Sequence, residues 1–170
     1  MTLAAGIDVG GTKVFGVVVD DAGNVVREHR VPTPRGGSEL IEAMALVAET
    51  IAPYDSLGVG VPGLVSRDGV LRASPNVVGI ADLAVAERLW ARLGHEVAVD
   101  NDATCAAAAE WKLGAARGRQ HVIMVTLGTG IGGGIIADGR LTRGVNGFAG
   151  EIGHFVVDAD GPPCPCGRRG

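Results

Sequence analysis

Two segments of this 170-residue chain share one pattern, in which an apolar strand, a glycine-rich turn, a second apolar strand and an Asp/Gly turn follow one another. The first segment spans residues 7–23 and the second spans residues 122–139. A unit that recurs within one chain predicts two lobes of similar architecture. The 28 glycines follow no three-residue period and gather at such turns. There the missing Cβ lets the backbone approach a ligand closely.

Strand and helix patterns alternate along the rest of the chain, which predicts an α/β sheet with helices packed on it. Short apolar runs predict strands at Ala5–Val9, Val14–Val19, Val25–Val31, Leu57–Val61, Val97–Val99, Val122–Leu127 and 134–137. Helices are expected over 38–51, from about 82 to 93 and from 102 to near 114, and residues 64–80 are expected to form a loop.

The helices carry their own boundary signals. Ser38 is the expected N-cap of the first helix, and Gly94 suits the C-terminal end of the second. The face that the first helix should bury contains Leu40, Met44 and Val47. The stripe expected to face the core in the second helix consists of Leu83, Ala86, Trp90 and Leu93.

Charge and composition exclude several classes of protein. The net charge is −4 and aromatic residues make up 4% of the chain, so neither a basic patch nor base-stacking surfaces are expected for nucleic acid. No apolar stretch approaches the roughly 18 residues of a membrane span, and the first residues lack the pattern of a signal peptide. The odd number of cysteines (Cys105, Cys164 and Cys166) fits a reducing compartment. The sequence therefore predicts a soluble cytoplasmic protein.

The first candidate site is the turn after the first strand, where Asp8 is followed by Val9 and then by Gly10, Gly11, Thr12 and Lys13. Backbone amides of a glycine turn can surround a phosphate, to which Thr12 would add a hydroxyl and Lys13 a positive charge. Asp8 could hold water around a magnesium ion. The alternative is an ordinary hairpin turn. The pattern is not a Walker loop, which needs a longer loop followed by a helix.

A second glycine turn follows the strand that ends at Leu127. The residues that could face a phosphate are Gly128, Thr129, Gly130, Gly132 and Gly133. These letters can also be aligned with a dinucleotide-binding fingerprint, but that fingerprint must open a helix. Here Ile135 and Ile136 precede an Asp/Gly turn and predict a strand. A glycine hairpin under phosphates therefore fits better.

The third candidate is Asp100-Asn101-Asp102, at the carboxyl end of a short strand, where open α/β sheets bind ligands. Asp102 opens a helix whose positive end favours an ionised carboxylate, and such a carboxylate can serve as a general base. Asn101 could donate to and accept from a sugar hydroxyl. The alternative is that the two residues only cap the helix.

The fourth candidate joins Glu151 and His154 to Cys164 and Cys166. Glu and His side chains suit a polyol, which needs several donors and acceptors at once. One His and two Cys are ligands that zinc takes, although a closed structural site needs four. A plain turn at Cys164-Pro165-Cys166 is the alternative.

These pieces, in this order, resemble the ROK family of bacterial sugar kinases and repressors, and its glucokinases most closely. The resemblance covers essentially the whole chain and is carried by residues 8–13, 60–63, 74–76, 100–102, 127–134 and 151–166. It implies the duplicated actin-like ATPase fold of hexokinases, which is also ribonuclease H-like. It further implies transfer of the γ-phosphate of ATP, with Mg²⁺, to the 6-hydroxyl of a hexose such as glucose, and a homo-oligomer for the full-length protein.

The same resemblance implies a role for each matching residue. Asp102 would be the general base. The sugar would be bound by Gly63, Asn76, Asn101, Asp102, Glu151 and His154. The two glycine turns would face the ATP phosphates, and His154, Cys164 and Cys166 would bind a structural zinc ion. Residues 1–113 would form the small N-terminal lobe, and residues 114–170 the start of the large lobe.

One departure from the family concerns the C-terminus. In the family a further cysteine follows this Cys-x-Cys run, whereas this sequence ends at Gly170. We therefore expect a fragment with a truncated second lobe, without the fourth zinc ligand and with little kinase activity by itself.

Several alternatives stay open within and beyond the family. The sugar could be N-acetylmannosamine, fructose, allose or mannose, and the phosphate donor could be polyphosphate. A non-catalytic sugar-sensing protein is a further alternative. A repressor is disfavoured, because the first strand begins at residue 5 and leaves no room ahead of it for a DNA-binding domain.

Overall fold

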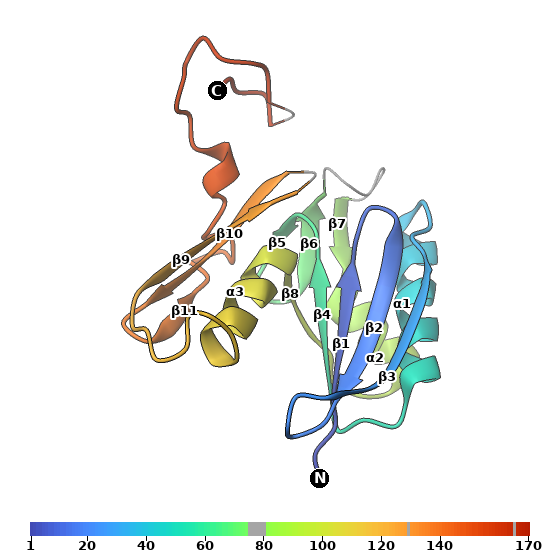
Figure 1. Cartoon of the computed structure of the whole chain (residues 1–170). Coiled ribbons are helices and arrows are strands. Elements are labelled where there is room, and N and C mark those ends of the chain that lie inside the picture. Colours follow the sequence, from blue (N-terminus) through green and yellow to red (C-terminus); the bar gives the residue numbers. More distant parts are fainter. Residues whose placement is uncertain (75–80, 129, 165) are drawn as a thin grey trace. The chain divides into compact units, whose positions relative to one another are not determined.

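A computed structural model describes residues 1–74, 81–128, 130–164 and 166–170 of the chain. The chain forms two compact units, Met1–Asp102 and Ala103–Gly170, and Figure 1 shows the elements of each. The predicted lobe boundary between residues 113 and 114 stays a prediction.

The first unit is built on a five-stranded sheet with strand order β3-β2-β1-β4-β8. Strands β1 (Ala4–Val9), β2 (Lys13–Val19) and β3 (Val25–Pro32) form an antiparallel meander. Strands β4 (Ser56–Val61) and β8 (Ala98–Asn101) continue the sheet in parallel with β1. This mixed sheet confirms the α/β prediction. Both ends of each of its five strands lie within two residues of the predicted ends.

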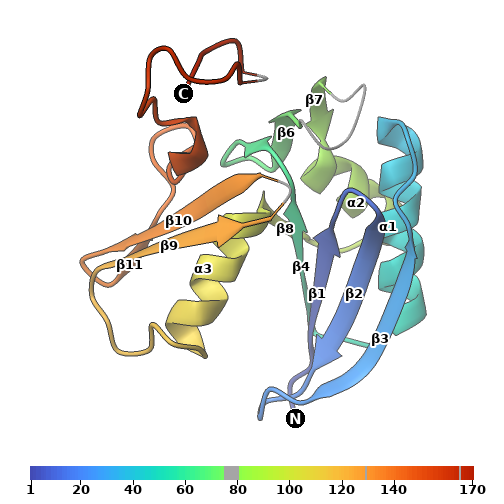
Figure 2. The ribbon, with the colours of Figure 1, turned by 45° about the horizontal axis from the view of Figure 1, so that its top comes forward.

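Helix α1 (Gly37–Ile51) packs on β2 and β3 (Figure 2). Leu40, Met44 and Val47 are fully buried, as predicted. The prediction of Ser38 as N-cap was wrong, because the helix begins one residue earlier and Gly36 occupies the cap position without a side-chain hydrogen bond. The Ser38 hydroxyl instead accepts a hydrogen bond from Arg88 at 3.0 Å.

The prediction of a loop over residues 64–80, followed by a helix from about residue 82, was wrong at residues 64–65, 70–73 and 81–84. Strands β5 (Leu64–Val65), β6 (Val70–Ala73) and β7 (Ala81–Ala84) form a small antiparallel sheet, and α2 spans only Val85–Leu93. Leu83 is buried from strand β7, where it pairs with Leu71. Tertiary pairing thus overrides the local helix pattern.

The late start of α2 also changes its buried face. Val85 and Leu89 are fully buried, whereas Trp90 is 58% exposed. The prediction that Trp90 faces the core was therefore wrong, whereas Leu93 packs on the core as predicted. Gly94 ends the helix as predicted, in a left-handed conformation from which its N–H donates to the Trp90 carbonyl.

The second unit contains α3 (Asp102–Lys112), whose first residue belongs to the first unit, and an antiparallel sheet of order β11-β10-β9. Its strands are β9 (Val122–Leu127), β10 (Ile131–Ala137) and β11 (Arg140–Thr142). The predicted Asp/Gly turn is present, with positive φ angles at Asp138 and Gly139. A strand, a glycine turn and a second strand thus follow one another in both units, as predicted, whereas the third strand of the second unit, β11, was not predicted.

Strand β10 begins earlier than the strand predicted over residues 134–137. Leu127 pairs with Ile131, so Gly132–Gly134 lie within the strand and not in the turn. A Cβ at Gly134 would lie 2.3 Å from the Cβ of Ala107 on α3, and one at Gly133 would lie 2.7 Å from the Gly150 carbonyl oxygen. These glycines therefore let α3 and the segment around Gly150 pack directly on the β10 backbone.

Among the described residues, no helix combines the length and the apolar character that crossing a bilayer requires.

Gly134→Ala should destabilise the fold by about 1–3 kcal/mol, because its Cβ would overlap Ala107 and push α3 away from β10. Gly58→Ala is the matched control, since nothing lies within 4 Å of a Cβ at that position. Urea unfolding of both variants measures the difference. Equal midpoints for Gly134→Ala and the unchanged protein would contradict the packing role.

Candidate active site

Three polar segments follow the carboxyl ends of the parallel strands in the first unit. The turn after β1 contains Gly10–Lys13, the turn after β4 contains Gly63, and β8 ends in Asn101 followed by Asp102. In the strand register Asp8 is paired with Gly60, and Gly60 with Asp100. The parallel pairing therefore places these segments at one edge of the sheet, where α/β proteins bind ligands.

The β1–β2 turn is closed by hydrogen bonds of its own. The Gly10 N–H donates to the Lys13 carbonyl at 2.8 Å, so this amide is used within the turn. Gly11 and Thr12 are exposed, and a Cβ at Gly11 would meet nothing within 4 Å. The open side of the turn is thus at Gly11 and Thr12, where a phosphate could approach the backbone.

Thr33, which was not among the predicted site residues, fixes the position of this turn. Its hydroxyl donates to the Gly10 carbonyl at 2.6 Å, and its N–H donates to the Thr12 carbonyl at 3.1 Å. The signal that could have revealed it is a threonine between Pro32 and Pro34, directly after a strand predicted to pair with β2.

Asp8 and Lys13 give the turn its charges. Burial of the Asp8 carboxyl raises its pKa above the ordinary value, and the positive charge of Lys13 partly offsets this rise. The Lys13 ammonium also lies 5.2 Å from the centre of the Phe15 ring, in a cation–π contact. A cation beside the carboxyl end of β1 is suited to an anionic ligand.

Asn101 connects the end of β8 to the turn after β4. Its side-chain amide donates to the Gly63 carbonyl at 3.1 Å, and its backbone N–H donates to the Asp100 carboxylate at 2.9 Å. Asp102 is the first residue of α3, where the helix dipole favours a negative charge. The structure thus brings Gly63, Asn101 and Asp102 together, as three of the predicted sugar-binding residues.

In the second unit the β9–β10 turn has a different surface from the strand that follows it. Gly128 and Gly130 are exposed, and a Cβ at either would meet nothing within 4 Å. Gly132 and Gly133 are instead packed against protein atoms of this unit. Gly128 and Gly130 are therefore better placed to meet a phosphate than the two strand glycines.

Glu151 and His154 lie beside the start of β10. Short helix η1 (Ile152–His154) packs on this strand. Gly153 allows the close approach, since a Cβ at this position would lie 2.2 Å from the Ile131 carbonyl oxygen. His154 Nε2 is 3.7 Å from a Glu151 carboxylate oxygen. Gly150, Gly153 and the close packing of η1 thus hold the predicted Glu/His pair in place. Gly150 and Gly153 were not among the predicted site residues, although glycines on both sides of Glu151 were a usable signal.

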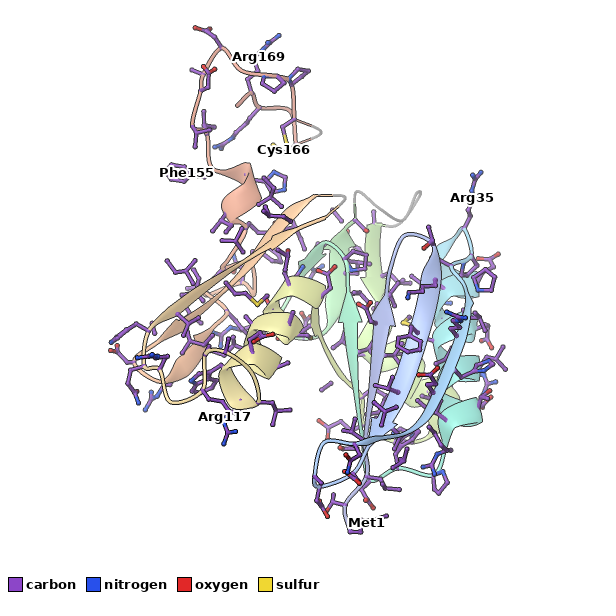
Figure 3. All side chains as sticks on the ribbon, viewed as in Figure 1. Met1, Arg35, Arg117, Phe155, Cys166 and Arg169 are labelled. Carbon is purple, nitrogen blue, oxygen red and sulfur yellow. The ribbon has the colours of Figure 1, made fainter. Side chains whose placement is uncertain are left out.

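The loop after η1 folds back on itself and carries Cys166 (Figure 3). The Val157 N–H donates to the Gly170 carbonyl, which closes the loop. One ligand atom from each of His154, Cys164 and Cys166 lies within 4.8 Å of the others, and His154 Nδ1 is 3.6 Å from Cys164 Sγ. The structure thus brings the three predicted metal ligands together.

Hydrogen bonding lowers the pKa of the Cys166 thiol to about 7. The Arg168 backbone N–H contributes most, followed by Cys164 and then His154. A thiol that loses its proton near neutral pH is a suitable metal ligand, because metals bind the thiolate. Two other predicted site residues, Asn76 and Thr129, lie outside the described residues.

Comparison with known proteins identifies the family. The sequence model of the ROK family matches residues 4–170. This chain belongs to the ROK family. It has the mixed α/β, actin-like ATPase fold of the ROK sugar kinases, as the resemblance of its motifs implied.

Two glucokinases of Streptomyces are among its relatives. The Streptomyces coelicolor glucokinase is 40% identical over 174 residues, which make up 100% of this chain and 55% of that protein. The crystal structure of a ROK family glucokinase from Streptomyces griseus, in complex with glucose and AMPPNP, is similar with a TM-score of 0.91 and 35% identity. That similarity covers 99% of this chain and 55% of the other.

The inorganic polyphosphate/ATP-glucomannokinase of Arthrobacter sp. strain KM is a third similar structure, with a TM-score of 0.78 and 36% identity. It is matched over 93% of this chain and 65% of its own. The present chain spans about half the length of the curated relatives that it matches.

Asp8→Asn should make the fold slightly more stable at pH 7, by at most about 0.5 kcal/mol. A carboxyl whose pKa is raised in the folded state costs stability once it is ionised, and this cost disappears below its ordinary pKa of about 3.9. The gain should therefore shrink as the pH falls from 7 towards 4. Urea unfolding at several pH values measures it.

Asp20→Asn is the matched control and should change stability in the opposite direction. Hydrogen bonds from the Asn24 side chain and backbone lower the pKa of Asp20, so the ionised form stabilises the fold above its ordinary pKa. A loss of stability at pH 7 in Asp8→Asn, like that of Asp20→Asn, would show that burial does not govern Asp8.

Proposed function

We propose that the protein carrying this chain is an ATP-dependent hexose kinase that phosphorylates the 6-hydroxyl of glucose or a close analogue. The observation that carries the proposal is the position of Asp102. It is the first residue of α3 and directly follows Asn101, the last residue of β8, in the sheet whose β1 strand ends at the glycine turn. The similarity to a glucokinase structure in complex with glucose and AMPPNP supports it. Use of ATP would place the reaction in the cytoplasm.

Asp102 would act as the general base. The helix N-terminus favours its ionised form, which can take the proton of the sugar hydroxyl as that oxygen attacks the γ-phosphorus. Phosphoryl transfer needs little covalent help from the protein, so positioning and charge neutralisation dominate. Sugar hydroxyls would be bound by Gly63, Asn76, Asn101, Asp102, Glu151 and His154.

The two glycine turns would bind the phosphates of ATP. The exposed backbone is at Gly11 and Thr12 in the first turn and at Gly128 and Gly130 in the second. No side chain separates a phosphate from the backbone at the three glycines, and Thr12 is the one residue of the four with a side chain. Lys13 adds positive charge. Mg²⁺ binds oxygen ligands through one or two carboxylates plus phosphates and water, which fits the carboxylate of Asp8. When bound, the ion would neutralise charge between the phosphates.

His154, Cys164 and Cys166 would hold a structural zinc ion. With metal–ligand distances of about 2.1 Å for nitrogen and about 2.3 Å for sulfur, a tetrahedral site separates the two atoms by about 3.6 Å. The separation of His154 Nδ1 and Cys164 Sγ is 3.6 Å, which supports the proposal for this pair of ligands. Glu151 at 3.7 Å from Nε2 would orient the ring. Within the described part of the chain, this His/Cys/Cys group contains three of the four ligands that a closed site needs.

Asp102→Asn tests the kinase and its base together. In the full-length protein, kcat should fall by about 10²–10⁴-fold on glucose, because the amide cannot accept the proton. The dissociation constant for glucose should stay within a few-fold when measured by calorimetry. Asp138→Asn is the control, since its side chain is 90% exposed and the residue has a positive φ that Asn tolerates.

The assay is ADP release with a panel of hexoses that includes mannose, fructose and N-acetylmannosamine. Full turnover by Asp102→Asn would refute the base assignment. Absence of turnover on every sugar, in a folded protein that binds glucose, would favour a sugar-sensing role. Polyphosphate should be tried as donor in the same panel, because the similar Arthrobacter enzyme is a polyphosphate/ATP-glucomannokinase.

Zinc binding is tested separately by metal analysis of the full-length protein. Cys166→Ser should lose most of the zinc and raise the KM for the sugar, because His154 would no longer be fixed. Cys105→Ser is the control for zinc content, since this cysteine lies on α3, outside the His/Cys/Cys group. Equal zinc content in both variants would contradict the proposed site.

A further inference from the structure

The residue that precedes Asp102 is held from two directions. The Asn101 backbone N–H donates to the Asp100 carboxylate at 2.9 Å, and the Asn101 side-chain amide donates to the Gly63 carbonyl at 3.1 Å. Asn101 also pairs with Val61 in the parallel ladder between β4 and β8. These contacts fix the backbone at the point where it leaves the sheet and enters α3.

Gly63 is itself in a position that no other residue can occupy without strain. Its φ angle is 121°, and a Cβ would lie 2.1 Å from the Ala73 carbonyl oxygen and 2.9 Å from the Ser74 Cα. The end of β6 is therefore packed directly on the Gly63 backbone. The Gly63 carbonyl, which accepts the hydrogen bond from the Asn101 amide, is thus held in place by the β5–β6–β7 sheet.

The small sheet is anchored at its other end as well. Gly69, in the turn between β5 and β6, has a positive φ, and a Cβ there would lie 2.5 Å from the Cβ of Ala86. The Ala86 N–H donates to the Gly69 carbonyl at 3.2 Å, which ties the turn to the start of α2. The β5–β6 hairpin is therefore fixed to α2 through Gly69 and to the end of β8 through Gly63.

We propose that Asn101 is a positioning residue for the Asp102 base, and that its hydrogen bond to the Gly63 carbonyl fixes the position of Asp102. This inference rests on the proposed kinase function. It gives Asn101 a role that does not depend on which sugar hydroxyl it contacts. Loss of the amide would let Asp102 shift, and a misplacement of about 1 Å at a reacting group can lower the rate about 100-fold.

Asn101→Ala in the full-length protein tests the positioning role through kcat. We expect kcat to fall by about 10–100-fold on glucose, 3-deoxyglucose and 4-deoxyglucose alike, because a displaced base affects the transfer step of every sugar. A residue that only contacts a hydroxyl would instead raise KM with kcat unchanged, or would spare the deoxy sugar that lacks this hydroxyl. Either of these results overturns the proposal.

Hydrogen exchange gives a readout that does not depend on kinase activity. Backbone amides of residues 99–104 should exchange faster in Asn101→Ala than in the unchanged protein, while the thermal midpoint stays within a few degrees. Unchanged exchange of this segment overturns the positioning role even if the protein phosphorylates no sugar. A failure of the proposed kinase function is thereby distinguished from a failure of this inference.

Gly63→Ala tests the same hydrogen bond through the residue that accepts it. Where this variant folds, its effect on kcat should not add to that of Asn101→Ala in the double variant, because both changes break one connection. Gly58→Ala, in the same strand–turn segment, has open space around its Cβ and should leave kcat unchanged. Additive losses in the double variant would contradict a shared pathway. If Gly63→Ala does not fold, the deoxy-sugar and exchange measurements on Asn101→Ala decide alone.

Discussion

Parallel pairing of β1, β4 and β8 is the constraint on which the site in the first unit depends. It aligns Asp8, Gly60 and Asp100 in one row across the sheet, so the segments that follow the three strands share one edge. Hydrogen bonds then fix these segments locally. Thr33 holds the β1–β2 turn, and the Asn101 amide joins β8 to the turn after β4. The sheet thus supplies the approximate positions, and a few polar contacts set the final ones.

In the second unit, close approach of backbones has the corresponding role. Helix α3 and the segment before η1 can pack on β10 only because Gly133 and Gly134 lack a Cβ. The same packing places Glu151 and His154 beside the start of β10 and brings His154 to the cysteine loop. The many glycines of this chain therefore have two physical uses, since exposed ones such as Gly11 and Gly128 leave space for a ligand and buried ones leave space for protein.

Features with a local signal were predicted correctly. The first meander, the buried face of α1 and the stop at Gly94 depend on residue alternation and glycine conformation, which neighbouring residues determine. Features that depend on distant residues were predicted wrongly. Strands β5 and β6 were predicted as part of a loop and β7 as the start of a helix, because these strands are two to four residues long and depend on pairing and packing with residues far away in the sequence. The wrong expectation that Trp90 is buried belongs to the same error, because it assumed a helix that begins before Val85.

The sequence by itself determined the family and the residue types of the candidate site, because their order along the chain is a one-dimensional pattern that the ROK family shares. The tertiary structure decided which of these residues meet. Strand register separated the turn glycines Gly128 and Gly130 from the packing glycines of β10, and hydrogen bonding selected Gly63 as the partner of Asn101. Such choices depend on distances between segments far apart in the chain, and sequence spacing does not contain those distances.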